Sequence, residues 1–99
     1  MTYRVRISGG AQADLERLFG FLVEHDLVAA LRAREAIETA YGLLADFPFA
    51  CRMVDEGNPF LRELLVQFGS AGYVILFEIE DRDTVTVAAV RHQREDDYR

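Results

Sequence analysis

Two stretches near the C-terminus alternate apolar and polar residues, and this alternation constrains the fold more than any other feature of the sequence. Residues 73–80 and 84–92 each carry apolar side chains at every second position. A period of two is typical of strands that bury one face. The short segment Asp81-Arg82-Asp83 between them predicts a turn. We therefore expect an antiparallel pair, whose inward faces would be Tyr73, Ile75, Phe77 and Ile79 on one strand and Val85, Val87 and Ala89 on the other.

The N-terminal half predicts one strand followed by two helices. Residues 2–7 alternate like a strand, and apolar residues recur at helical spacing from Ala11 to about His25. A second helical pattern runs from about Leu27 to Asp46, with Asp26 as its expected N-cap. Phe47-Pro48 should end it, because the residue before a proline is pushed out of the helical region.

The segment between the second helix and the C-terminal strands predicts a loop and one further strand. Residues 49–59 contain Gly57-Asn58-Pro59 and read as a loop. Residues 60–68 alternate again, and the glycine-rich run 69–72 predicts a hairpin turn. The expected order is β-α-α-β-β-β over a single domain, residues 1–99. This is an α+β fold in which a helical hairpin packs against an antiparallel-rich, twisted sheet.

Composition narrows the functional class. The 99 residues are 51% hydrophobic, enough for a core of their own. The sequence shows no run of 18 apolar residues and no apolar signal-peptide segment, so we expect a cytoplasmic protein that does not contact a membrane. Cys51 is the single cysteine, which excludes an internal disulfide. With two histidines and no ligand spacing, we expect no metal and no cofactor.

The charge balance argues against direct binding of nucleic acid. Acidic residues number 17 against 11 basic ones, and the formal net charge is −6. All the basic residues are arginines. Because the phosphate backbone repels an acidic protein, the chain alone should not bind nucleic acid.

The C-terminal run Ala88–Tyr98, which contains Arg-His-Gln-Arg-Glu, resembles the RelE/ParE superfamily of bacterial toxins. Arg62-Glu63-Leu64 and the opening Ala11–Leu15 add to the resemblance, which spans nearly the whole chain. For the RelE branch, the resemblance implies ribosome-dependent cleavage of mRNA without a metal. This cleavage requires a base, an acid and cations that stabilise the phosphorane. In the ParE branch it implies the same fold, without most of that catalytic set, and poisoning of DNA gyrase.

The acidic charge and the absence of lysine favour the ParE branch. The chain would then be the toxin of a type II toxin–antitoxin, plasmid-stabilisation-like module, causing growth arrest by protein–protein inhibition of DNA gyrase rather than by catalysis. Two alternatives stay open. One is a RelE-like, metal-independent ribosome-dependent endoribonuclease, and the other is a non-toxic member that only binds its antitoxin.

The nuclease alternative assigns chemistry to four residues. Arg62 would clamp phosphate, or else pair with Glu63 or another acid. His92 would act as a general acid or base, or else hydrogen-bond at the end of its strand. Arg94 would bind phosphate. Tyr98 would act as the acid, or else pack its ring on the sheet.

The resemblance also implies a cognate antitoxin, expected to be a ribbon-helix-helix, ParD-like protein that forms a hetero-oligomer with the chain. Its C-terminal segment would place a helix near the toxin helices and add a strand to a sheet edge. The first predicted helix has apolar residues on more than one of its sides. Because a helix of this kind is usually covered on more than one side, the pattern favours an external partner. The residues concerned are Leu15, Leu18, Phe19, Phe21 and Leu22. Arg62, Arg91 and Arg94 would bridge to antitoxin acids, although Arg91 and Arg94 have Glu95, Asp96 and Asp97 as alternative partners.

Overall fold

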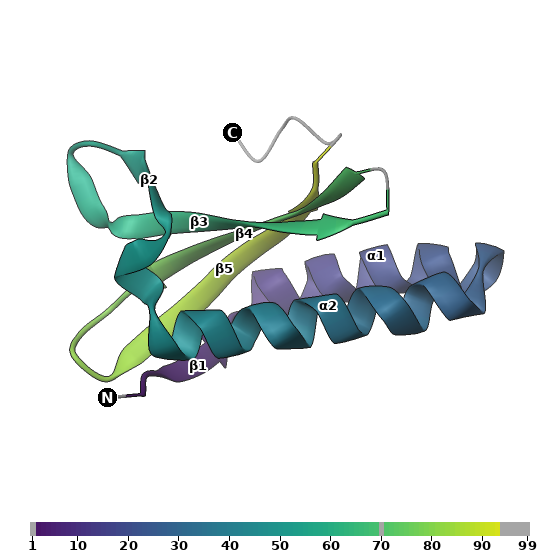
Figure 1. Cartoon of the computed structure of the whole chain (residues 1–99), viewed down its shortest axis with the longest axis horizontal. Coiled ribbons are helices and arrows are strands. Elements are labelled where there is room, and N and C mark those ends of the chain that lie inside the picture. Colours follow the sequence, from purple (N-terminus) through teal and green to yellow (C-terminus); the bar gives the residue numbers. More distant parts are fainter. Residues whose placement is uncertain (1, 70, 94–99) are drawn as a thin grey trace.

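Two helices in the N-terminal half pack against one five-stranded sheet (Figure 1). The computed structural model describes residues 2–69 and 71–93. The elements are β1 (Arg4–Ile7), α1 (Gly9–His25), α2 (Leu27–Asp46), a short 3-10 turn η1 (Pro48–Ala50), β2 (Arg52–Asp55), β3 (Asn58–Phe68), β4 (Ala71–Ile79) and β5 (Thr84–His92). The sheet order is β1-β5-β4-β3-β2, with β1 parallel to β5 and all other pairs antiparallel. The predicted α+β class is confirmed.

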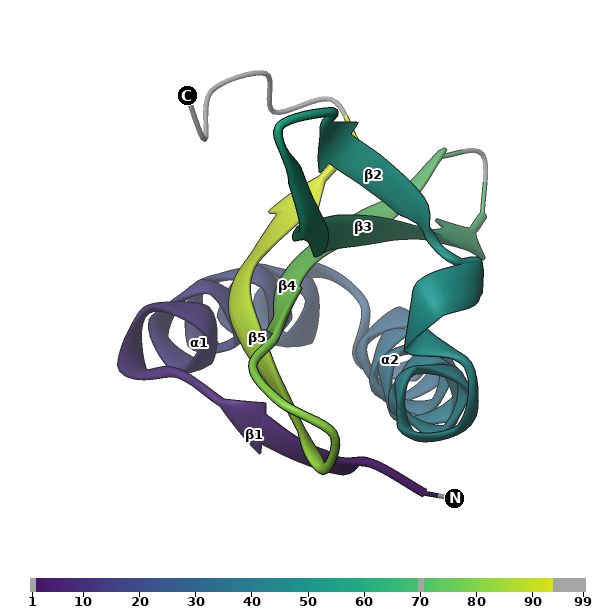
Figure 2. The ribbon, with the colours of Figure 1, turned by 90° about the vertical axis from the view of Figure 1, so that its left-hand side faces the viewer.

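Side-chain caps define the helical hairpin. The Ser8 hydroxyl accepts a hydrogen bond from the Ala11 amide at 3.1 Å and begins α1. The Asp26 carboxylate accepts one from the Ala29 amide at 3.1 Å and begins α2, as predicted. The amide of Asp26 also donates to the Leu22 carbonyl, so one residue ends α1 and caps α2. The connection is therefore tight, and the two helices lie side by side (Figure 2).

The loop predicted over residues 49–59 is wrong, because this segment contains η1 and the edge strand β2. β2 pairs with β3 through a hairpin in which Asp55 faces Asn58. The Asp55 carboxylate accepts a hydrogen bond from the Gly57 amide at 2.9 Å, which supports this two-residue turn. β2 has only four residues, which is too short to show a clear alternation of apolar and polar side chains. Only the turn residues that follow it indicated a hairpin.

The inward face predicted for the last strand is wrong beyond Val87. Phe77 pairs with Val87 and Leu76 pairs with Ala89, so Ala88 is an extra residue in β5. A β-bulge of this kind moves the following side chains to the opposite face. Val90 is therefore fully buried in place of Ala89. The run Ala88-Ala89-Val90 is apolar throughout, and alternation cannot show such a shift.

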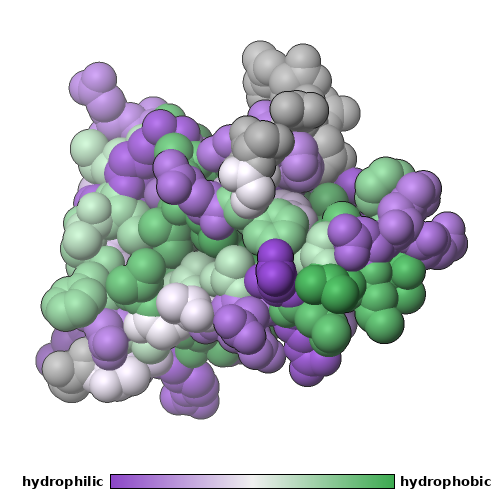
Figure 3. All heavy atoms as spheres, turned by 45° about the vertical axis from the view of Figure 1, so that its right-hand side comes forward, coloured by the Kyte–Doolittle hydropathy of each residue, from purple (hydrophilic) through white to green (hydrophobic). Residues whose placement is uncertain are grey.

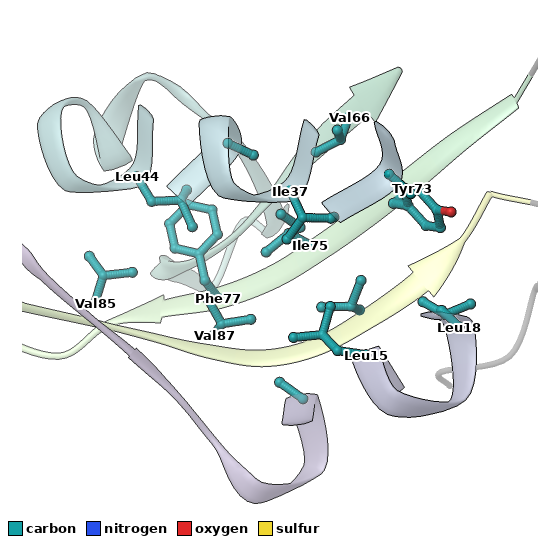
Figure 4. Packing of buried hydrophobic residues seen from close by; sticks show 14 of the residues in the cluster. Leu15, Leu18, Ile37, Leu44, Val66, Tyr73, Ile75, Phe77, Val85 and Val87 are labelled. Atoms are coloured by element: carbon teal, nitrogen blue, oxygen red, sulfur yellow. The ribbon is translucent and has the colours of Figure 1, made fainter. Parts of the chain in front are cut away.

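The core lies between the inward face of the sheet and the helical hairpin (Figure 4). Phe77 and Ile75 of β4 are fully buried, and α2 covers them with Ile37 and Leu44. The contribution of α1 comes mainly from Ala11, Leu15 and Leu18. Within residues 2–69 and 71–93, no helix is long and apolar enough to cross a membrane.

Candidate functional site

Arg62, in the first half of β3, donates three hydrogen bonds to backbone carbonyls. Its Nε donates to the Pro59 carbonyl at 2.8 Å, and its Nη1 donates to the carbonyls of Phe49 at 2.9 Å and Cys51 at 2.7 Å. The guanidinium also lies 5.1 Å from the centre of the Phe49 ring. Arg62 thus ties η1 and the start of β2 to β3. Burial raises the pKa of the neighbouring Cys51 thiol, and the charge of Arg62 partly offsets that rise.

The acid next to Arg62 in the sequence pairs with a different arginine. Arg52 on β2 faces Glu63 on β3, and its Nε and Nη2 lie 2.6 and 2.5 Å from the same carboxylate oxygen. This pair lies on the outward face of the sheet, because Glu63 also faces Leu76 rather than the buried Phe77 or Ile75.

Asp14 of α1 holds the end of β5. Its Oδ2 accepts a hydrogen bond from the Val90 amide at 2.9 Å and lies 2.6 Å from Nη1 of Arg91. Arg17 adds a longer contact of 3.7 Å to the other carboxylate oxygen. Sequence reasoning missed this role of Asp14, since 76 residues separate it from Val90. The alternative partners of Arg91 in the C-terminal tail lie outside the described residues.

His92 lies at the end of β5 against an aromatic ring. It faces Tyr73, and the two rings meet edge to face with centroids 5.8 Å apart. Burial raises the pKa of the Tyr73 hydroxyl. Arg94 and Tyr98, the other two candidates of the nuclease alternative, lie outside the described residues.

The structure does not bring Arg62 and His92 together. Arg62 faces Phe77 on β4, and His92 faces Tyr73, four residues before Phe77 on the same strand. At the rise of a β-strand this is a separation of about 13 Å, and the buried Ile75 lies between the two positions.

The outward face of the sheet carries acids on β3 and β4 and arginines on β1, β2 and β5. Glu63 and Glu78 lie on it, with Glu78 facing Thr86. Among the described residues of β3, β4 and β5, Arg91 is the one base on that face, and it is paired with Asp14. Arg4 and Arg6 extend the face at the β1 edge, where they lie beside Thr84 and Thr86. No group of three His, Cys, Asp or Glu side chains within residues 2–69 and 71–93 is placed to bind a metal.

The helical residues expected to contact a partner separate into covered and exposed ones. Leu15 and Leu18 are only 8% and 9% exposed, so the chain's own core covers them. Phe19 and Leu22 pack partly against that core. Phe19 also lines a groove of about 410 Å³ between α1 and α2. Phe21, at 61% exposure, is the one that faces solvent.

Phe21 belongs to a larger apolar surface at the end of the helical hairpin, visible in Figure 3. We call it the tip patch; its members, 53% to 61% exposed, are Phe21, Val23, Leu27, Val28 and Leu31. Sequence reasoning missed the last three, because apolar helical residues give no sign of which face the sheet covers. Exposed apolar surfaces of this kind are typical of regions that bind another protein.

Comparisons with known proteins show the family and support the fold. The family described as "ParE toxin of type II toxin-antitoxin system, parDE" matches residues 5–97. Toxin RelE1 of Caulobacter vibrioides is 37% identical over 79 residues, which are 80% of this chain and 82% of that protein. A solved structure described as "Chromosomal ParDE TA system from P. aeruginosa" has the same fold, with a TM-score of 0.70 at 15% identity, over 92% of this chain and 96% of that one. The chain therefore belongs to the ParE toxin family of type II toxin–antitoxin systems.

Proposed function

We propose that this chain arrests growth as a ParE-like toxin, by inhibiting DNA gyrase through protein–protein contact in the cytoplasm and not through catalysis. A cognate antitoxin, proposed to be ribbon-helix-helix and ParD-like, neutralises it within a hetero-oligomer. Family membership implies the antitoxin. The gyrase target and the absence of an enzymatic activity are the proposed parts.

The observation that carries this proposal is the arrangement of the arginines. Phosphorane stabilisation needs cations aimed at the reacting phosphate. The Arg62 guanidinium instead donates to three backbone carbonyls, and Arg91 pairs with Asp14. About 13 Å of β4 separates the positions that Arg62 and His92 face. These residues do not form one catalytic constellation.

The charge of the molecule supports the same choice. A nuclease that docks on ribosomal RNA needs a basic surface to attract phosphate. Here the net charge is −6. A protein target tolerates an acidic surface, provided that the target offers a basic one.

We propose the tip patch and the adjoining groove between α1 and α2 as the surface that the antitoxin covers. The groove is lined by apolar side chains from both helices, including Leu15, Phe19 and Ile37, and by the charged side chains of Glu16, Arg34 and Glu38. An amphipathic antitoxin helix would place its apolar face there.

Pulse-labelling of DNA and protein synthesis, minutes after induction of the chain without its antitoxin, tests the proposal. We expect DNA synthesis to stop first while translation continues, and the His92→Ala variant to remain nearly as toxic. Early loss of translation, abolished by His92→Ala in a folded variant, would refute the proposal in favour of the ribosome-dependent nuclease. Growth without arrest would instead identify a non-toxic family member.

A further inference from the structure

Side chains from the β2–β3 hairpin and the β4–β5 turn line an aromatic cleft. These two segments lie at the end of the molecule opposite the α1–α2 turn (Figure 1). The cleft has a volume of about 460 Å³. Its apolar walls come from Tyr3, Phe49, Phe60 and Ile79. Phe49 and Phe60 are 48% and 49% exposed, so two rings face solvent in a recess instead of packing in the core. We call this site the aromatic cleft.

The contacts around the aromatic cleft hold its walls in place. The Phe49 and Phe60 rings meet edge to face with centroids 6.2 Å apart. Arg62 fixes Phe49 through its carbonyl and its ring. On the opposite wall, Glu80 accepts a hydrogen bond from the Thr86 hydroxyl. The cleft is thus built before any partner arrives, which lowers the entropy cost of binding.

The rim of the aromatic cleft is acidic. Glu78, Glu80 and Asp81 line it, against a single base, Arg82. Glu78 and Asp81 form no ion pair with another described side chain. The Phe49 ring already holds the Arg62 guanidinium, and the exposed Phe60 ring is left to attract a further cation through its quadrupole. The carboxylates of the rim add a second attraction of the same sign. The walls and rim together complement a cationic side chain with an apolar stem, as in arginine.

We propose that the aromatic cleft receives an arginine side chain from the DNA-binding surface of the target enzyme. This inference rests on the proposed function, because it takes gyrase to be the target. An enzyme that binds DNA presents arginines and lysines to phosphate. This chain has a net charge of −6, so it is negatively charged like DNA and is attracted to the same basic surface. The aromatic cleft adds a contact that DNA phosphate lacks, because an arginine guanidinium can stack on an aromatic ring in the cleft.

Inhibition of plasmid supercoiling by purified gyrase tests the inference. The double variant Glu78→Gln/Asp81→Asn removes two rim charges without changing shape, and we expect the inhibitory concentration to rise about tenfold or more. The matched control, Glu24→Gln/Glu35→Gln, removes two exposed charges from the helices and should leave inhibition nearly unchanged. Phe60→Leu should also weaken inhibition, whereas Phe47→Leu, which changes an exposed ring outside the cleft, should not.

The outcomes separate this inference from the proposed function. A wild-type chain that leaves gyrase unaffected would refute the proposed function, and with it the role of the aromatic cleft. Cleft variants that inhibit as strongly as the wild type, or helix-charge controls that lose as much inhibition, would refute the inference alone. Each variant should have the same midpoint temperature of thermal unfolding as the wild type, which shows that its fold is intact.

A second measurement addresses the chemistry of the aromatic cleft without gyrase. In NMR titrations with N-acetylarginine amide, we expect shifts of the Asn58 and Phe60 amides that are lost in Glu78→Gln/Asp81→Asn. N-acetylcitrulline amide, which has nearly the same shape but no charge, should cause none. Equal shifts with both compounds, or none with either, would overturn the inference.

Discussion

Arg62 holds the segment between α2 and β3 by hydrogen bonds to carbonyls rather than by an ion pair. A guanidinium can do this because its donors form a planar fork, whereas the lysine ammonium is a compact point charge. We expect Arg62→Lys to lower the free energy of unfolding by about 2 kcal/mol, because carbonyls bonded to a charged donor lose their partner. Urea denaturation measures the change.

The control for this prediction is Arg34→Lys on α2. Arg34 lies 3.5 Å from Glu38 in an exposed pair one helical turn apart. Replacing it should change the free energy of unfolding by less than about 0.5 kcal/mol. An Arg62→Lys variant as stable as this control would show that the three carbonyl contacts do not stabilise the fold.

Tyr41 carries a polar group that the interior leaves unsatisfied. Its buried hydroxyl finds no hydrogen-bond partner among the described residues. Burial, with a smaller contribution from Glu38, raises the pKa of Tyr41 from 10.0 to about 12. Since the hydroxyl gains nothing on folding, Tyr41→Phe should raise the free energy of unfolding near neutral pH by about 1 kcal/mol.

The raised pKa of Tyr41 also predicts a dependence of stability on pH. Between pH 10 and about 12 the unfolded chain loses this proton while the folded chain keeps it, so stability falls as pH rises through that window. Tyr73 acts in the same direction. Denaturation at several pH values should therefore show a shallower fall for Tyr41→Phe than for the wild type. Parallel curves would contradict the assignment.

At the scale of elements, α1 replaces β1 as the neighbour of β5 beyond the bulge. β1 pairs with β5 only as far as Val87, and the Ser8 amide then donates to the Val87 carbonyl at 3.0 Å. Past Ala88, the Asp14 carboxylate accepts from the Val90 amide. A helix side chain thus satisfies a strand amide that would otherwise lack a partner.

The variant Asp14→Ala tests how much this contact between α1 and β5 stabilises the fold. We expect the free energy of unfolding to fall by about 2 kcal/mol, because both the Val90 amide and Arg91 lose a charged partner. Hydrogen exchange at the Val90 amide should become faster. Asp14→Asn keeps an acceptor for that amide and should have a smaller effect, and Glu16→Ala on exposed α1 surface should have almost none. An unchanged rate of hydrogen exchange at the Val90 amide in Asp14→Ala would show that the Asp14 carboxylate does not protect this amide.

In the whole molecule, the α1–α2 turn and the β4–β5 turn lie toward opposite ends of the 39 Å longest axis (Figure 1). The tip patch surrounds the first turn, and the second turn lines the aromatic cleft. A toxin that is neutralised by one protein and acts on another needs surfaces for both. Surfaces at opposite ends allow variants that lose one interaction and keep the other.

The double variant Phe21→Ser/Leu31→Ser should weaken binding of the cognate antitoxin by about a hundredfold, because exposed apolar anchors dominate such interfaces. Calorimetric titration with the antitoxin measures this, and thermal unfolding confirms the fold. The control Phe47→Ser removes an equally exposed ring away from the tip patch and should leave affinity within about threefold. Equal losses in both variants would remove the tip patch from the antitoxin interface.

The candidate site was only partly predictable. The sequence singled out Arg62, His92 and Arg91, but their partners come from remote segments: carbonyls 11 and 13 residues away for Arg62, and a carboxylate on α1 for Arg91. Sequence reasoning also could not tell Leu15, which the core covers, from Leu31, which solvent reaches. Both are apolar helical residues, and only the position of the sheet separates them.

The helical hairpin, the longer strands and the acidic charge follow from the amino-acid sequence, because each depends on local periodicity, a cap such as Asp26, or composition. Tertiary structure alone decided the pairing of β2, the bulge at Ala88 and the aromatic cleft. These depend on contacts between residues far apart in the chain, and the energy of such contacts is realised only once the sheet and helices have packed together.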